Sequence, residues 1–282
     1  MKKELALSFL AICLGFSLMA TKNDRITGAR SGAMGNASVT FSSVYSAFNN
    51  QAGLGGLEYA EAGIAYRNHF MLSETGYKAA AVAVPFKSFG VIGVSFSSFG
   101  YSAYGEHQIG LAYAKQFGKK LSMALQLDYL QLQFNEPYGS TGVLLGEFGV
   151  QAQLTQDLRF GFHVYNPTRA YLNKDVDERV PTYIKAGLAY EFSEKLLTTF
   201  EINKDLDHNP DFRVGVEYKP VQKLAIRAGF NTSPASPSLG AGFLFGNWRI
   251  DLSSEYHYAL GFTPQASIRY VFEKSASKKA QK

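Results

Sequence analysis

The sequence has very little cysteine and no long apolar run after its first twenty residues. Cys13 is the only cysteine among 282 residues, so an internal disulfide is excluded. Beyond the N-terminus, no stretch of eighteen uninterrupted apolar residues occurs, which excludes a later transmembrane helix. The net charge is only +5, and much of the basic excess lies in the last nine residues. A nucleic-acid-binding surface is therefore not expected.

The first twenty residues have the pattern of a secretory signal peptide. Two lysines precede an apolar run over 5–20, which ends on Ala20, a small residue suited to cleavage. A membrane anchor would need a run of about 20 residues, and this run is shorter. A lipoprotein would use Cys13, but the bulky Ile12 precedes it. We therefore expect residues 1–20 to be removed and the mature chain to reach a Gram-negative outer membrane.

From residue 59 to 273 apolar and polar side chains alternate, which is typical of β-strands with one apolar face. In one run the apolar positions change from odd to even near Tyr129, which predicts a β-bulge there. Short turns alternate with longer loops, as in outer-membrane barrels. We predict an all-β fold, a closed antiparallel transmembrane β-barrel of about fourteen strands, over 59–70, 77–87, 91–104, 106–118, 120–135, 142–155, 158–166, 181–193, 196–205, 211–219, 223–231, 238–246, 248–258 and 265–273.

Several features of these strands favour an apolar face that points outward into lipid. That face carries almost no charge over the middle of any strand, where Arg or Lys would cost ~2–4 kcal/mol. Aromatic residues recur near strand ends, as they do at a membrane interface. The polar face combines glycine with bulky charged side chains. We expect the lumen to be lined by Arg159, His163, Lys185, Arg213, Glu217, Arg227, Arg249, Asp251 and Arg269.

Residues 21–58 do not alternate, and small residues dominate them. We expect this segment to fold back into the lumen as a plug, or hatch, before a barrel over 59–273. A basic periplasmic tail is expected over 274–282. The residues of the segment that form a recognisable motif are Gly28, Arg30, Met34, Gly35, Asn49, Asn50, Gln51, Ala52, Gly53 and Leu54.

In this motif the chain resembles the FadL-like outer-membrane barrels, and within them the PorV/PorQ group. The family pattern is a small-residue run, G-A-R-x-x-x-M-G, followed by an Asn-Pro-Ala-Gly-Leu-like element. This sequence departs from the pattern at Gln51, where the family usually has proline. The resemblance implies fourteen strands and an N-terminal plug, in agreement with the count above.

The resemblance implies two different functions. PorV and PorQ serve type IX protein secretion, whereas FadL moves long-chain fatty acids and similar hydrophobic molecules inward. The leading hypothesis is a PorV/PorQ-like accessory or cargo-handling component of secretion, and the alternative is a passive transporter of small hydrophobic molecules. A shared fold does not choose between them. An apolar pocket or a sideways opening would favour transport, and a smooth polar interior with large outward loops would favour partner binding.

The sequence predicts a protein that is not an enzyme, with no cofactor and no metal site. Its histidines show no metal-ligand spacing, and none stands with a serine and an acid in a triad order. His163 is expected only to fill the lumen. The expected partners are outer-membrane lipid, together with secretion-system proteins or secreted cargo under the first hypothesis. Under the second hypothesis they are hydrophobic small molecules, and no nucleic acid is expected under either.

Overall fold

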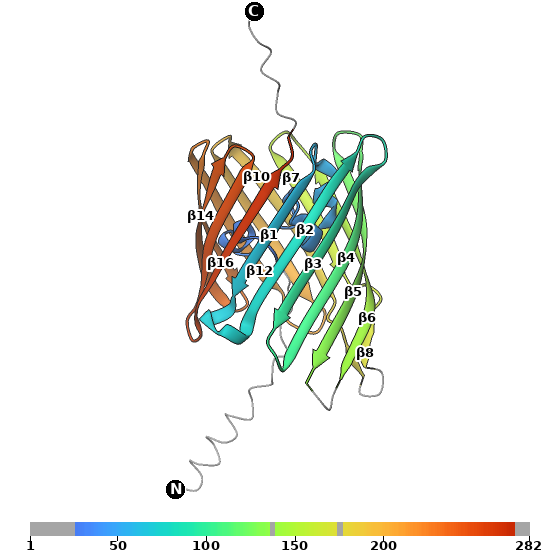
Figure 1. Cartoon of the computed structure of the whole chain (residues 1–282). Coiled ribbons are helices and arrows are strands. Elements are labelled where there is room, and N and C mark those ends of the chain that lie inside the picture. Colours follow the sequence, from blue (N-terminus) through green and yellow to red (C-terminus); the bar gives the residue numbers. More distant parts are fainter. Residues whose placement is uncertain (1–25, 136–138, 174–176, 274–282) are drawn as a thin grey trace, which may run out of the picture.

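The protein folds as a closed antiparallel β-barrel in the computed structural model, which describes residues 26–135, 139–173 and 177–273. Fourteen strands close the barrel in the order β1-β16-β15-β14-β13-β12-β11-β10-β7-β6-β5-β4-β3-β2 (Figure 1). The barrel closes where β1 pairs with β16, from Glu61 opposite Val271 to Arg67 opposite Gln265. The predicted fold class and strand number are confirmed.

The barrel strands lie close to the predicted spans. They are β1 (Glu61–Asn68), β2 (Gly76–Phe86), β3 (Gly90–Gly100), β4 (Tyr104–Phe117), β5 (Leu121–Phe134), β6 (Ser140–Gln153), β7 (Leu158–Tyr165), β10 (Tyr183–Ser193), β11 (Leu196–Asp205), β12 (Asp211–Val221), β13 (Leu224–Thr232), β14 (Ala235–Phe245), β15 (Trp248–His257) and β16 (Gly261–Val271). The clearest shifts are in β14 and β16, which begin at Ala235 and Gly261 rather than at 238 and 265.

The two ends of the barrel differ in their connections. At the upper end in Figure 1, the strands are joined by short turns over 87–89, 118–120, 154–157, 194–195, 222–223 and 246–247. The opposite end carries the longest connection, 166–182, with a hairpin of β8 (Tyr171–Asn173) and β9 (Glu178–Arg179). It also carries η2 (His69–Met71) and η3 (Ser73–Thr75) between β1 and β2. Outer-membrane barrels share this asymmetry, and their short turns face the periplasm.

The outer surface of the barrel is apolar and its interior is polar. Along β5, Leu125 and Leu127 are 63% and 68% exposed, whereas Gln126 and Asp128 are 3% and 1% exposed. A soluble barrel would have the opposite arrangement, because exposing leucine to water is unfavourable. The exposed apolar side chains therefore form the lipid-facing surface of a transmembrane barrel. None of the described helices is long and apolar enough to cross a membrane.

The predicted bulge near Tyr129 is wrong. β5 pairs with β4 and β6 without a register shift along their described lengths. Leu130 and Leu132 lie on the same inward face as Asp128 and are buried against Leu145. The change from odd to even apolar positions therefore marks an apolar patch inside the barrel, not a change of register.

Residues 26–57 lie inside the barrel, where Figure 1 shows them in blue. We call this stretch the lumenal segment; it contains α2 (Ala29–Ala33), α3 (Ser46–Asn49) and η1 (Gln51–Gly56). α2 contacts β13, β14, β15 and β16, whereas η1 contacts β3, β4, β5 and β6. The predicted signal peptide and basic tail, residues 1–20 and 274–282, lie outside the described residues.

Candidate functional site

On one side of the lumen, arginines and carboxylates connect the lumenal segment to the wall. Arg30 of α2 donates to both carboxylate oxygens of Glu217 in β12, over 2.8 and 3.0 Å. Glu217 also pairs with Arg227 of β13 at 2.6 Å, and Arg227 pairs with Asp251 of β15 at 2.7 Å. Charge-assisted bonds of this kind are roughly twice as strong as neutral ones. α2 is therefore bound directly to β12 and is linked through Glu217 and Arg227 to β13 and β15.

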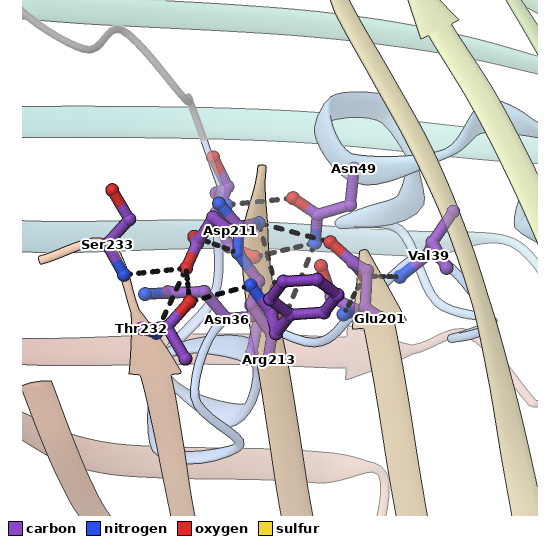
Figure 2. Close-up of polar contacts among 12 residues, drawn as sticks. Asn36, Val39, Asn49, Glu201, Asp211, Arg213, Thr232 and Ser233 are labelled. Carbon is purple, nitrogen blue, oxygen red and sulfur yellow. Dashed lines mark hydrogen bonds and ion pairs between the residues drawn. The ribbon is translucent and has the colours of Figure 1, made fainter. Parts of the chain in front are cut away.

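A second group of contacts surrounds Arg213 of β12 (Figure 2). The Arg213 guanidinium lies 3.1 Å from Glu201 of β11 and 2.8 Å from Asp211. Oε2 of Glu201 accepts the backbone N–H groups of Ser38 and Val39 at 2.7 and 2.8 Å. The main chain of the lumenal segment is thus bound directly to a buried carboxylate of the wall.

A third group joins the segment to the seam between β1 and β16. Glu61 of β1 accepts the backbone N–H of Val44 at 2.8 Å and pairs with Arg269 of β16 at 3.0 Å. The Tyr45 hydroxyl lies 2.9 and 2.8 Å from one backbone carbonyl oxygen in each of the two strands. We call the wall side chains of these three groups the ionic sector: Glu61, Glu201, Asp211, Arg213, Glu217, Arg227, Asp251 and Arg269.

Wall glycines allow the lumenal segment to approach closely. A Cβ at Gly229 would lie 1.9 Å from the backbone nitrogen of Gly35, and one at Gly215 would lie 2.6 Å from the carbonyl oxygen of Met34. Both contacts are with backbone, which cannot move aside as a flexible side chain can. The segment also approaches closely at Gly149, Gly161 and Gly240, where a Cβ would lie 2.2, 2.5 and 2.6 Å from the nearest atom of the segment. The glycine-rich polar face of the strands therefore matches the shape of the segment.

On the other side of the lumen, the segment makes mainly neutral contacts. Ala52 and Leu54 of η1 pack against alanines of the wall, Ala81, Ala83, Ala112, Ala114 and Ala124. The Ser122 hydroxyl donates to the carbonyl of Ala52 at 2.7 Å. Gln51 donates through Nε2 to Glu147 of β6 at 2.5 Å. We call this part of the wall, β2 to β7, the neutral sector.

Toward the long-loop end, the lining of the neutral sector changes from polar to apolar. We define an outer-mouth cluster by its four buried residues, Leu130, Leu132, Leu145 and Val180. The cluster lies under the connection 166–182, which contributes Val180 itself and the adjoining Ala170 and Leu172. Asp128 adjoins the cluster, because it pairs across the strands with Leu145 and lies two residues before Leu130 along β5.

Below the outer-mouth cluster lies a group of buried polar side chains, which we call the polar floor: Gln51, Gln126, Asp128, Glu147 and His163. Gln126 donates to Asp128 at 2.8 Å. His163 Nε2 lies 2.7 Å from Glu147 Oε2. The side chains come from η1, β5, β6 and β7, so the floor joins the lumenal segment to the wall.

Two recesses open between the segment and the wall near the short-turn end. The larger, of about 470 Å³, is lined mainly by charged residues that include Arg30, Glu61, Glu217, Arg249 and Arg269. The smaller, of about 290 Å³, includes Arg159, Glu191 and Lys195. These recesses are polar, so neither is the apolar pocket between plug and wall that would favour hydrophobic transport.

The polar residues that the sequence places in the lumen all lie on inward-facing positions. His163, Lys185, Arg213, Glu217, Arg227 and Asp251 are buried. Arg159, Arg249 and Arg269 are partly exposed and line the recesses. The structure brings Arg213, Glu217, Arg227, Asp251 and Arg269 into the ionic sector, and it places His163 apart from them on the polar floor.

The motif residues of the lumenal segment have separate structural roles. Arg30 makes the bidentate pair described above, Met34 and Gly35 pack on wall glycines, and Leu54 packs on wall alanines. Near the start of the segment, Asn49 Oδ1 accepts a hydrogen bond from the backbone N–H of Thr27. Asn50 caps η1, because its Oδ1 accepts the backbone N–H of Ala52, the neighbour of Gly53. Gly28 has a φ of 96°, a conformation that favours glycine. Gln51 uses its side chain to reach Glu147, which a proline could not do.

Sequence reasoning missed five carboxylates that organise the lumen: Glu61, Asp128, Glu147, Glu201 and Asp211. Glu201 was open to detection, because it alternates with outward-facing Phe200 and Ile202 in a strand whose span was predicted correctly. Asp128 and Glu147 also follow from the alternation of β5 and β6. The hydrogen-bond partners of these carboxylates could not be predicted, since bonds such as that from Gln51 to Glu147 join positions far apart in sequence.

The acidic and histidine side chains of the described residues are candidate metal ligands. No group of three His, Cys, Asp or Glu side chains among them is placed to hold a metal ion. At the long-loop end, burial together with the positive charge of Arg67 lowers the pKa of His69 to about 3. His69 is therefore neutral near pH 7, and its ring packs edge-on against Phe99.

No model of a known protein family matches this chain, and no curated protein matches it. Solved structures do match. The CymD monoaromatic hydrocarbon channel aligns with a TM-score of 0.66 at 14% identity, over 89% of this chain and 99% of that one. The Ralstonia pickettii toluene transporter TbuX aligns with a TM-score of 0.67 at 13% identity, over 88% and 98% of the two chains.

A third match is a Pseudomonas aeruginosa FadL homologue, with a TM-score of 0.57 at 13% identity over 88% of this chain and 98% of that one. The chain therefore has the fold of the FadL-like barrels. Sequence identities this low establish the fold alone. The matched proteins are described as channels and transporters rather than enzymes.

Proposed function

We propose that this protein takes up small hydrophobic molecules across the outer membrane, as a FadL-like transporter. The observation that carries the proposal is the outer-mouth cluster, which places leucines inside the barrel at the long-loop end of the lumen. Ligand sites are mostly apolar with a few placed polar groups, and the cluster with its polar floor has this composition. The hydrocarbon channel and toluene transporter that share the fold support the same class of cargo.

This proposal reverses the order of the two hypotheses drawn from the sequence. The transported molecule would pass along the neutral sector. β3 pairs with β2 and β4 without a register shift along its described length, so the wall there has no sideways opening. The route therefore runs lengthwise, from the outer-mouth cluster past the polar floor to η1. Hydrogen bonds contribute about 0.5–1.5 kcal/mol each when both partners are neutral and about 1.5–3 kcal/mol when one is charged, as in the bond from Gln51 to Glu147. Both values lie below the cost of breaking a buried ion pair, so η1 can shift while α2 stays bound to the ionic sector.

Uptake of toluene by intact cells tests the proposal. Deletion of the gene should lower uptake, and the wild-type gene should restore it. Restoration with Leu130→Asn should leave uptake about tenfold lower, because burying a leucine side chain contributes about 1.5–3 kcal/mol. Gln133→Asn, on the outward face of the same strand, is the matched control and should restore uptake fully. Unchanged uptake after deletion would overturn the proposal.

A PorV/PorQ-like role in protein secretion is the second candidate function. The ionic sector favours it, because a lumenal segment bound by buried ion pairs makes a filled barrel suited to anchoring partners at the cell surface. The same deletion strain distinguishes the two functions. Loss of surface cargo with normal toluene uptake would favour secretion.

A further inference from the structure

The polar floor indicates which hydrophobic molecules the site prefers, an inference that rests on the proposed function. We propose that the site binds molecules with an apolar body and a hydrogen-bond-donating head group, a hydroxyl or an amine. The head group would lie at Asp128, and the body would lie against Leu130 and Leu145 of the outer-mouth cluster.

Three oxygen atoms of the polar floor carry the inference. Asp128 Oδ2, Gln126 Oε1 and Gln51 Oε1 are buried and accept no hydrogen bond from any described residue. The three side chains are only 1%, 3% and 0% exposed. A buried acceptor without a donor destabilises the protein, because it has lost its bonds to water. A ligand that brings a donor to this place removes that cost, and a pure hydrocarbon does not.

Hydrogen bonds show that the three acceptors belong to one group. Nε2 of Gln126 lies 2.8 Å from Asp128 Oδ1 and 3.4 Å from Glu147 Oε1. Nε2 of Gln51 lies 2.5 Å from Glu147 Oε2. Both amide nitrogens are thus directed at carboxylates, which leaves the amide oxygens and Asp128 Oδ2 without donors.

Gly110 lets the carboxyl group of Asp128 pack directly against β4. Gly110 of β4 pairs across the strands with Asp128 of β5. A Cβ at Gly110 would lie 2.4 Å from Asp128 Oδ1 and 2.6 Å from the Ser95 hydroxyl. A side chain at Gly110 would therefore displace the carboxyl group of Asp128 from this place.

The same chemistry disfavours a carboxylate head group. A carboxylate would place acceptors against the acceptor oxygens of the floor and would bury its own negative charge beside Glu147, which is itself buried. Unpaired charges of this kind are a common means of rejecting a wrong ligand. The expected order of affinity is a donor head group first, then a hydrocarbon, then a carboxylate.

Four probes with the same ring test this order by titration calorimetry of the purified barrel in detergent: benzyl alcohol, benzylamine, toluene and benzoate. Each titration is corrected with detergent alone. The alcohol or the amine should bind at least about tenfold more tightly than toluene, the size expected when a buried acceptor that lacks a donor gains one. A preference confined to the amine identifies a cationic head group, and a preference for both identifies a neutral donor as sufficient.

Two variants locate the effect. Asp128→Asn should abolish the preference for the amine over toluene, and Gly110→Ala should weaken both donor probes while toluene binds as before. Gly146→Ala is the matched control, because a Cβ there meets no atom within 4 Å. Equal binding of all four probes, or a preference that survives both variants, would overturn the inference and leave the proposed function standing. Binding of none of the probes would overturn both.

Discussion

The two sides of the lumen hold the same segment by different chemistry. In the ionic sector, Arg30 and the backbone of Ser38 and Val39 meet wall carboxylates that are also paired with arginine. In the neutral sector, η1 rests on alanines and on a few hydrogen bonds from neutral groups. The ionic sector therefore fixes the segment, and the neutral sector leaves part of it able to move.

The difference indicates where a molecule can pass. Removing one partner of a buried ion pair costs about 3–5 kcal/mol, whereas a single hydrogen bond contributes about 0.5–1.5 kcal/mol, or about 1.5–3 kcal/mol where it ends on a carboxylate such as Glu147. Any motion that opens the lumen should therefore occur beside β3 to β7. The outer-mouth cluster lies on that same side, at its long-loop end.

The largest expected effect on stability comes from the ionic sector. Arg213→Met should lower the free energy of unfolding by about 3–5 kcal/mol, because Glu201 and Asp211 would be left buried beside an apolar side chain. Urea unfolding in lipid vesicles measures this change. Lys219→Met is the matched control, since Lys219 is 46% exposed and its pair with Glu217 spans 3.5 Å; it should cost under about 1 kcal/mol. Similar losses in both variants would contradict the assigned role of the ionic sector.

Replacement of Gly229, on the same side of the lumen, should give the next largest effect on stability. Gly229→Ala should cost about 1–3 kcal/mol, because its Cβ would lie 1.9 Å from the backbone of Gly35. The variant should also make the lumenal segment more sensitive to added protease. An unchanged unfolding curve together with unchanged proteolysis would show that the segment does not need this close approach.

The corresponding glycine of the neutral sector should give the smallest effect. A Cβ at Gly93 would lie 2.7 Å from Leu54 Cδ1, the far end of a flexible side chain. Gly93→Ala should therefore cost under about 1 kcal/mol, because Leu54 can rotate away. The same unfolding assay applies. A cost equal to that of Gly229→Ala would remove the distinction between the two sectors.

The strands were predictable because lipid enforces one apolar face on every strand. The span predicted over 196–205 matches β11, and most other ends lie within a few residues of the prediction. The late predicted starts of β14 and β16 have a common cause. Pro237 and Pro264 suggested loops, yet both lie inside strands, opposite Phe230 and Ser254. Proline cannot donate to a neighbouring strand, but it can occupy a position where no donor is needed.

The lumenal sites were only partly predictable. Alternation identifies which side chains face inward, among them the buried Arg213 and Glu217. It does not identify an apolar patch inside the barrel, so Leu130 and Leu132 were taken as outward-facing residues after a bulge. They are apolar because the connection 166–182 covers them, through contacts such as that with Val180. Contacts of this kind join distant parts of the chain and leave no local pattern.

Thiol labelling inside the lumen tests most directly whether small hydrophobic molecules pass along the neutral sector. Cys13, the only cysteine, lies in the predicted signal peptide, so an introduced thiol can be labelled alone. Leu130→Cys reacted with benzyl methanethiosulfonate should lose toluene uptake, because the added ring fills the outer-mouth cluster. Arg249→Cys, in the larger recess, should keep its uptake after the same labelling. Full uptake by labelled Leu130→Cys, or equal loss in both variants, would contradict the proposed route.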